Sequence, residues 1–288
     1  MGEFYHLDSY TGSVEVRLWK IANYILNGTI LVNHNRNYLI KEVEAYLHSD
    51  DHPDPFVHKD PHQLSSGCWY FHRQNEKAYK GGTFKGLDIT FGYKDDENCY
   101  GGFLIRSLYC LTTQQLIQGP SNCVDDLCRN KGIVRLVYHL RKQTEEKPPI
   151  PVNLGSHLQL VPVENKRTQK MHASPRVGLT LKRGTYQDKA QYLMRPYRFT
   201  VDSDKIKKNK SMIFIGGLVA NNNLFDLVKE LRVGTSVAKK WERTFLSGKA
   251  MAKKVGYDRM TRQYVGKTLS MSDYLKLYGA YVHYCETR

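Results

Sequence analysis

Polar and apolar side chains alternate from Glu42 onward within residues 40–47, which read Ile-Lys-Glu-Val-Glu-Ala-Tyr-Leu. Side chains point to opposite faces along a strand, so this segment predicts one apolar face and one face that carries Glu42, Glu44 and Tyr46. A carboxylate two residues from a tyrosine could activate water beside a stacking platform. The solvated acidic face of a half-buried strand has the same spacing, so the alternation alone leaves both interpretations open.

The rest of the hydrophobic pattern predicts an α+β fold. Apolar positions at helical spacing over residues 13–27 predict a helix that ends at Asn27-Gly28, and residues 29–33 predict a strand that precedes the strand at 38–47. Further strands are expected at residues 81–92, 102–111 and 195–202, and further helices at 122–130 (capped by Ser121), 222–232 and 236–247. We expect a curved, largely antiparallel sheet flanked by helices, followed by a basic helical extension.

Charge divides the chain unevenly. The formal net charge is +15, from 43 Lys and Arg against 28 Asp and Glu. Residues 205–288 hold 17 of the basic side chains and only 6 of the acidic ones, whereas residues 1–204 are close to neutral. We therefore predict a domain over 1–204 and a DNA-binding extension over 205–288, because a basic segment of this kind is typical of a partner that is a polyanion.

Composition bears on the compartment. The chain has no apolar run of about 18 residues that would predict a membrane span. Its first residues lack the basic and apolar pattern of a signal peptide, and its six cysteines show no paired spacing. We expect an intracellular protein with free thiols and no membrane partner.

Five short motifs follow one another in order between residues 14 and 202. They are Glu42-Val43-Glu44-Ala45-Tyr46-Leu47, Asp54-Pro55-Phe56-Val57-His58, Leu104-Ile105-Arg106-Ser107-Leu108, Gly119-Pro120-Ser121, and Arg176-Val177-Gly178 with Pro196-Tyr197-Arg198-Phe199. As a collinear set they resemble the alkyladenine (3-methyladenine) DNA glycosylase family. The residues after 204 lie outside the resemblance.

The resemblance implies a monofunctional DNA glycosylase, which flips a nucleotide out of DNA, hydrolyses its N-glycosidic bond and leaves an abasic site. It implies that Glu44 is the general base and that Tyr46 and His58 hold the flipped nucleotide. Arg106 matches a basic residue that orders the acidic site; a buried arginine with a structural role is the alternative. The resemblance implies no cofactor and no metal.

The segment between the second and third motifs departs from the family. Asp88 stands where the family has an asparagine that discriminates between bases. An ionised carboxylate only accepts hydrogen bonds, so Asp88 favours a base that presents amino or hydroxyl hydrogens. We expect an unusual or bulky modified base, for example in hypermodified viral DNA, and a role in antiviral defence. Base-excision repair of alkylated or deaminated purines is the alternative.

Several residues in this segment are candidates for roles that have no clear match. The second stacking ring is sought among Trp69, Tyr70, Phe71 and Tyr79. The candidates for the wedge that fills the gap in the duplex are Tyr79 and the tip Lys80-Gly81-Gly82. No lysine matches a Schiff-base position; Lys41 and Lys85 are the nearest to consider.

Basic side chains are the candidate DNA contacts. Near the pocket they are Lys80 and Lys85; in the extension they are Lys239, Lys240, Arg243, Lys253 and Lys254. They alternate with Trp241, Phe245, Tyr257 and Tyr264, which suits phosphate contacts and base stacking. The alternative is that the aromatic rings pack the helices together while the lysines are solvated.

Two other classes of function remain open. A metal-dependent nuclease could use the crowded segment His48, Asp50, Asp51, His52, Asp54, His58, Asp60 and His62, although its prolines disfavour a helix. A non-catalytic reader of nucleic acid could use the same scaffold without turnover.

Overall fold

The computed structural model describes residues 7–74, 78–94, 98–129, 134–138, 149–153, 158–182 and 186–288. Two compact units make up the chain: unit 1, Met1–Met171, and unit 2, His172–Arg288. The division lies before residue 205, the boundary suggested by charge, so the late strand predicted at 195–202 belongs to unit 2.

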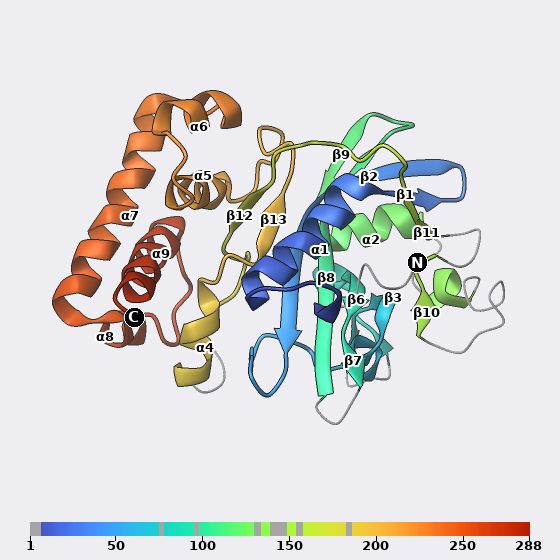
Figure 1. Cartoon of the computed structure of the whole chain (residues 1–288), viewed down its shortest axis with the longest axis horizontal. Coiled ribbons are helices and arrows are strands. Elements are labelled where there is room, and N and C mark those ends of the chain that lie inside the picture. The colour runs from blue at the N-terminus through green and yellow to red at the C-terminus, as the bar shows by residue number, and fades with distance from the viewer. Residues whose placement is uncertain are drawn as a thin grey trace. The chain divides into compact units, whose positions relative to one another are not determined.

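Unit 1 is built on a curled antiparallel sheet with the strand order β10-β3-β6-β8-β2-β1-β11, in which β2 and β8 are the long central pair (Figure 1). The strands on this path are β1 (Thr29–Asn33), β2 (Arg36–His48), β3 (Ser66–Phe71), β6 (Leu87–Phe91), β8 (Asn98–Cys110), β10 (Ile150–Pro151) and β11 (Gln159–Pro162). Two short strands, β7 (Tyr93–Lys94) and β9 (Gln115–Gln118), also pair with β8. The α+β prediction with a curved antiparallel sheet flanked by helices is confirmed.

Two helices pack on this sheet. Helix α1 (Val14–Gly28) begins where the Ser13 side chain accepts a hydrogen bond from the amide of Val16, and it packs against β2 through the apolar stripe seen in the sequence. Helix α2 (Pro120–Cys128) packs against β8. The predicted Ser121 cap was wrong, because the helix begins one residue earlier at Pro120, a residue favoured at the first helical position. Ser121 donates a hydrogen bond to the carbonyl of Gly82 instead.

Short elements complete unit 1. They are the single-turn helices η2 (Leu7–Ser9), η3 (Pro61–Leu64) and η4 (Gly82–Phe84), and the hairpin of β4 (Arg73–Gln74) and β5 (Ala78–Tyr79). The bent strand expected over 81–92 is therefore a helical turn followed by β6.

Unit 2 contains two short strands, which pair with each other, and a group of helices. The elements are β12 (His172–Ser174), α4 (Tyr186–Leu193), β13 (Arg198–Thr200), α5 (Lys210–Val219), α6 (Leu224–Leu231), α7 (Thr235–Val255), α8 (Tyr257–Arg262) and α9 (Met271–Glu286). Helices α6 and α7 confirm the two amphipathic helices expected in this region.

Helices α7 and α9 cross with their backbones in contact. A Cβ atom on Gly248 would meet the backbone of Lys276, and one on Gly279 would meet the carbonyl of Phe245. Beside the crossing, the rings of Phe245 and Tyr278 meet edge to face with centroids 5.9 Å apart. The crossing therefore fixes which side of α7 faces α9.

Among the described residues, no helix is both long and apolar enough to span a membrane. The six cysteines carry free thiols, and five of them are buried.

Candidate active site

The central strand pair carries two compensating β-bulges. Lys41 is the extra residue on β2 and Arg106 is the extra residue on β8, so the register is the same on both sides of the irregularity. A bulge redirects side chains that a regular strand would send to opposite faces. Here it lets the consecutive residues Arg106 and Ser107 both reach Glu42.

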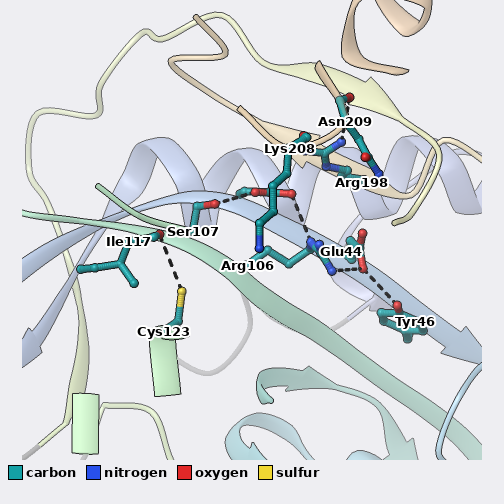
Figure 2. Close-up of polar contacts among 10 residues, drawn as sticks. Glu44, Tyr46, Arg106, Ser107, Ile117, Cys123, Arg198, Lys208 and Asn209 are labelled. Carbon is teal, nitrogen blue, oxygen red and sulfur yellow. Dashed lines mark hydrogen bonds and ion pairs between the residues drawn. The ribbon is translucent and has the colours of Figure 1, made fainter. Parts of the chain in front are cut away.

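Arg106 lies between the two glutamates of β2 (Figure 2). Its Nε donates to Oε1 of Glu42 at 3.1 Å, and its Nη1 donates to Oε2 of Glu44 at 3.3 Å. Ser107 Oγ donates to the second oxygen of Glu42 at 2.5 Å. Tyr46 Oη donates to Oε2 of Glu44 at 3.0 Å. Glu44 therefore accepts hydrogen bonds from an arginine and from a tyrosine whose ring is partly exposed.

The charge of Arg106 is secured by this arrangement. Burial by itself opposes a charged guanidinium, but Glu44 and Glu42 outweigh burial and raise the pKa of Arg106 above its ordinary value. Glu44 has no exposed surface and Glu42 has 3%. A buried cation between two buried carboxylates offsets a repulsion that the strand spacing would otherwise impose.

A row of directly paired residues crosses four strands. Glu44 pairs with Leu104, Leu104 with Asp88, and Asp88 with Tyr70. Directly paired residues of antiparallel strands present their side chains on the same face. This row, called the carboxylate row below, therefore places Glu44 and Asp88 on one face with the apolar side chain of Leu104 between them.

The neighbouring row on the same face contains a glycine. Tyr46 pairs with Gly102, and Gly102 with Thr90. A Cβ atom on Gly102 would lie 2.7 Å from Oδ2 of Asp88, which is too close for a real side chain. The absence of a side chain at Gly102 therefore lets the Asp88 carboxylate lie directly against β8.

Asp88 is paired with His72, which lies two residues after Tyr70 of the carboxylate row. His72 Nε2 lies 2.7 Å from Oδ1 of Asp88, and both side chains are largely buried. The imidazole lies against Gly86, because a Cβ atom at that glycine would collide with the ring. The backbone amide of His72 also donates to the carbonyl of Gly86 at 3.0 Å. The ring is thus held on one side by a backbone and on one edge by a carboxylate.

His58 stands over this pair from the loop that follows β2. Its ring meets that of His72 edge to face at 4.5 Å, and its Nδ1 lies 3.1 Å from Tyr70 Oη. Lys80 Nζ lies 2.9 Å from Nε2 of His58. Desolvation, then the nearby His72 and Lys80, lower the pKa of His58 to about 4. A neutral ring suits both contacts, since Nε2 then accepts from the ammonium and Nδ1–H donates to Tyr70.

The structure separates the other candidates near the pocket. Trp69 belongs to the buried apolar row Ala45–Phe103–Ile89–Trp69 on the opposite face of the sheet, and its indole donates to the carbonyl of Leu158. Tyr79 is partly exposed in the β4–β5 hairpin and meets Phe71 edge to face. Of Trp69, Tyr79 and Lys80, Lys80 is the one whose side chain contacts His58.

The two lysines considered as nucleophiles are both engaged. Lys41 is buried and its Nζ donates to Oε1 of Gln169 at 3.1 Å. Lys85 forms an ion pair with Asp125. Neither contact is with Glu44.

The acidic and histidine-rich segment at 48–62 forms ion pairs and turns. Asp60 accepts two hydrogen bonds from Arg73, at 2.9 Å from Nε and 2.5 Å from Nη2. Asp54 accepts from the amide of Phe56 at 3.0 Å. In the part of the chain that the structure describes, no three His, Cys, Asp or Glu side chains gather as a metal site.

The predicted DNA contacts of the extension share one side of α7. Lys239, Lys240, Arg243, Lys253 and Lys254 are exposed, and helical geometry places them opposite the buried Ala238, Phe245, Gly248 and Ala252. We call these five residues the basic stripe. The aromatic residues pack inward: Trp241 meets Phe214 at 5.8 Å, and Tyr257 stacks on Tyr284 at 5.0 Å. The packing alternative thus holds for these rings.

The fold and the site define an α+β protein whose central sheet carries paired acidic and histidine side chains on one face. No family model matches the sequence. The chain is 33% identical over 206 residues to a protein of Acanthamoeba polyphaga mimivirus that bears the name uncharacterized protein L759. The match covers 67% of this chain and 89% of that protein. The chain therefore belongs to the same family as L759.

Three residues of the site were not singled out from the sequence. Ser107 reaches Glu42 only because of the bulge, and Gly102 matters only because Asp88 lies beside it on the next strand. For His72 a signal was present: it follows Tyr70 at a spacing of two, which predicts the same face of a strand.

Replacing Arg106 by methionine should cost about 3–5 kcal/mol of unfolding free energy, because Glu42 and Glu44 would then be buried without a cation. Lys85→Met is the matched control. It also removes a cation from an ion pair, but its partner Asp125 is 55% exposed, so it should cost less than about 1 kcal/mol. Urea unfolding of the two variants measures both values. Equal losses would contradict the role assigned to Arg106.

Titration of the His58 ring by NMR should give a pKa below the ordinary value of about 6.5. Because the folded-state pKa is lowered, stability is fully present above about pH 6.5 and falls as the pH drops towards 4. Lys80→Gln should raise the His58 pKa, since it removes a neighbouring positive charge. The same charge change at the exposed Lys166 should leave it unaltered. A His58 pKa at or above 6.5 in the parent would refute this account.

Proposed function

We propose that the protein is a monofunctional DNA glycosylase in which Glu44 is the general base. The carboxylate row carries this proposal. It sets Glu44 and Asp88 on one face, two strand spacings apart, which is about 10 Å, with Leu104 between them. A flipped nucleotide lying across this row would have its sugar near Glu44 and its base near Asp88. The five collinear motifs that resemble the alkyladenine glycosylases support the same assignment.

Hydrolysis would use the contacts that Glu44 makes. Cleavage of an N-glycosidic bond develops positive charge on the sugar, and a nearby carboxylate stabilises that charge while it accepts a proton from the attacking water. Tyr46 and Arg106 orient the Oε2 atom of Glu44. In this proposal Tyr46 stacks on the base, and His58 contacts the nucleotide.

The contacts of the lysines favour hydrolysis over a lyase reaction. A Schiff base requires an uncharged lysine at the anomeric carbon. Lys41 donates to Gln169, and Lys85 is paired with Asp125. We therefore propose that the product is an abasic site without strand cleavage.

The substrate we propose is an unusual or bulky modified base. Asp88 accepts hydrogen bonds, so it favours a base that presents amino or hydroxyl hydrogens. Bases of this kind occur in hypermodified viral DNA, which would make defence the biological role. Repair of alkylated or deaminated purines is the competing assignment within the same chemistry.

The basic stripe of α7 is the surface we propose for the DNA backbone. Its five cations lie on one side of a 21-residue helix and are exposed. Cations in such a line can neutralise successive phosphates, which gives affinity without reading the sequence of bases.

The reaction is tested by measuring abasic-site release from plain, alkylated, deaminated, hydroxymethylated and glucosylated DNA in the presence of a chelator. Glu44→Gln should slow release by about 100-fold or more while the chain stays folded. Glu42→Gln is the matched control: it removes a charge from the same strand and the same arginine, and it should slow release by less than about 10-fold.

Other outcomes point to other classes of function. DNA binding without release from any substrate would favour a non-catalytic reader. Activity that the chelator abolishes would favour a metal-dependent nuclease. Rapid release confined to alkylated purines would favour repair over the unusual base, and equal effects of the two glutamate variants would remove Glu44 from its role.

DNA affinity should fall steeply with salt, and the double change Lys239→Gln with Lys240→Gln should reduce the slope of log K against log salt by about 2. The same double change at Lys166 and Lys170, which are exposed in unit 1, is the control for total charge and should alter the slope little. Fluorescence anisotropy at several salt concentrations measures both. Equal reductions would show that net charge, and not α7, governs binding.

A further inference from the structure

His72 has a geometry that the proposed hydrolysis does not yet use. Its Nε2 is bound to Asp88 at 2.7 Å, whereas no hydrogen-bond partner of its Nδ1 occurs among the described residues. The His72 side chain is 12% exposed. Gly86 on one side, together with the rings of His58 and Tyr70, fixes its plane. An imidazole bound to a carboxylate at one nitrogen and unengaged at the other is arranged to deliver a proton from the second nitrogen.

We propose that His72, oriented by Asp88, is the general acid that protonates the departing base. This inference rests on the proposed glycosylase function and deepens it. Asp88 then orients the acid as well as facing the base.

The position of His72 on the sheet fits an acid that works opposite the general base. Asp88 lies two strands away from Glu44 in the carboxylate row, so His72 lies on the base side of a nucleotide whose sugar is near Glu44. A proton donor at Glu44 itself could not reach the ring nitrogens of the base. In this proposal Glu44 acts at the sugar and His72 acts at the leaving base.

The charged groups around His72 favour a single proton donor. Asp88 is its counter-charge at 2.7 Å. The Lys80 ammonium contacts His58, whose lowered pKa keeps that ring neutral, and Asp60 accepts hydrogen bonds from Arg73. Tyr70 is a poor acid here, because burial and the nearby Asp88 and Asp60 raise its pKa. Of these groups, His72 is the one placed to give a proton to the base, through its Nδ1.

The proposed step balances without any further reactant. The C1′–N bond breaks and its electron pair stays on the base, which receives the proton from Nδ1 of His72. Water attacks C1′ and gives a proton to Glu44. The products are the abasic sugar, the free base, neutral His72 and protonated Glu44, and exchange with solvent restores both residues.

The acid role predicts dependence on the leaving group. A neutral base departs slowly as an anion, so its release should need the proton; a base that already carries a positive charge should not. The enzyme should therefore be suited to neutral modified bases.

The test compares single-turnover release of one base with and without a ring fluorine. The base is the neutral one released fastest in the DNA panel above, and the fluorine is at C5 of a pyrimidine or C2 of a purine. Fluorine makes the base a better anion but harder to protonate, so the parent should show less than about a 3-fold difference. In His72→Gln the plain base should slow by about 100-fold, and the fluorinated base by much less.

The ratio of the two rates within one variant does not depend on the fraction of protein that is folded. Asp88→Asn should shift the ratio in the same direction, and His283→Gln, a histidine change in α9 of unit 2, should leave it unchanged. Equal slowing of both bases in His72→Gln, or a panel in which only cationic alkylated bases are released, would overturn the acid role. Failure of the proposed function is distinct, because it would appear as no release by the parent or as full release by Glu44→Gln.

Discussion

The site depends on one buried cation between two buried carboxylates. Glu42 and Glu44 share a face of β2, and without Arg106 their charges would repel in a region almost without water. The arginine reaches both only because β8 carries an extra residue at that point and β2 carries one nearby. The backbone irregularity and the ion cluster are therefore a single feature: the bulge positions the cation, and the cation keeps the two strands from separating there.

The two faces of the sheet carry different kinds of side chain. One face carries the apolar row that ends at Trp69, which packs the core, and the other carries Glu44, Leu104, Asp88 and Tyr70. Because neighbouring strands are evenly spaced, the distance between the two acidic groups is a property of the fold and not of flexible loops. A rigid spacing of this kind suits a reaction in which two ends of one bound molecule must be served at once.

Periodicity predicted the elements that depend on local sequence. The helix at 13–27, the alternating strand at 40–47 and the helices of the extension were found because their apolar positions repeat every few residues. The bulge at Arg106, the pairing of His72 with Asp88 and the contact of Asp88 with Gly102 join segments far apart in the chain, and no local pattern encodes a register between strands. The division at residue 171 was not predicted, because the boundary after residue 204 was placed from charge. Charge depends on local composition, whereas the compact units depend on contacts between distant segments.

The crossing of α7 and α9 has a consequence for how this protein can change over generations. Gly248 and Gly279 allow no larger residue, so the inner side of α7 is committed to one partner helix. The outer side of α7, which carries the basic stripe, does not restrict the size of its residues in this way. Charges there can be added or removed singly, and the affinity for the proposed DNA partner would then change by small increments while the architecture stays as it is. The side of α7 that can vary and the side that cannot therefore lie opposite each other on the same helix.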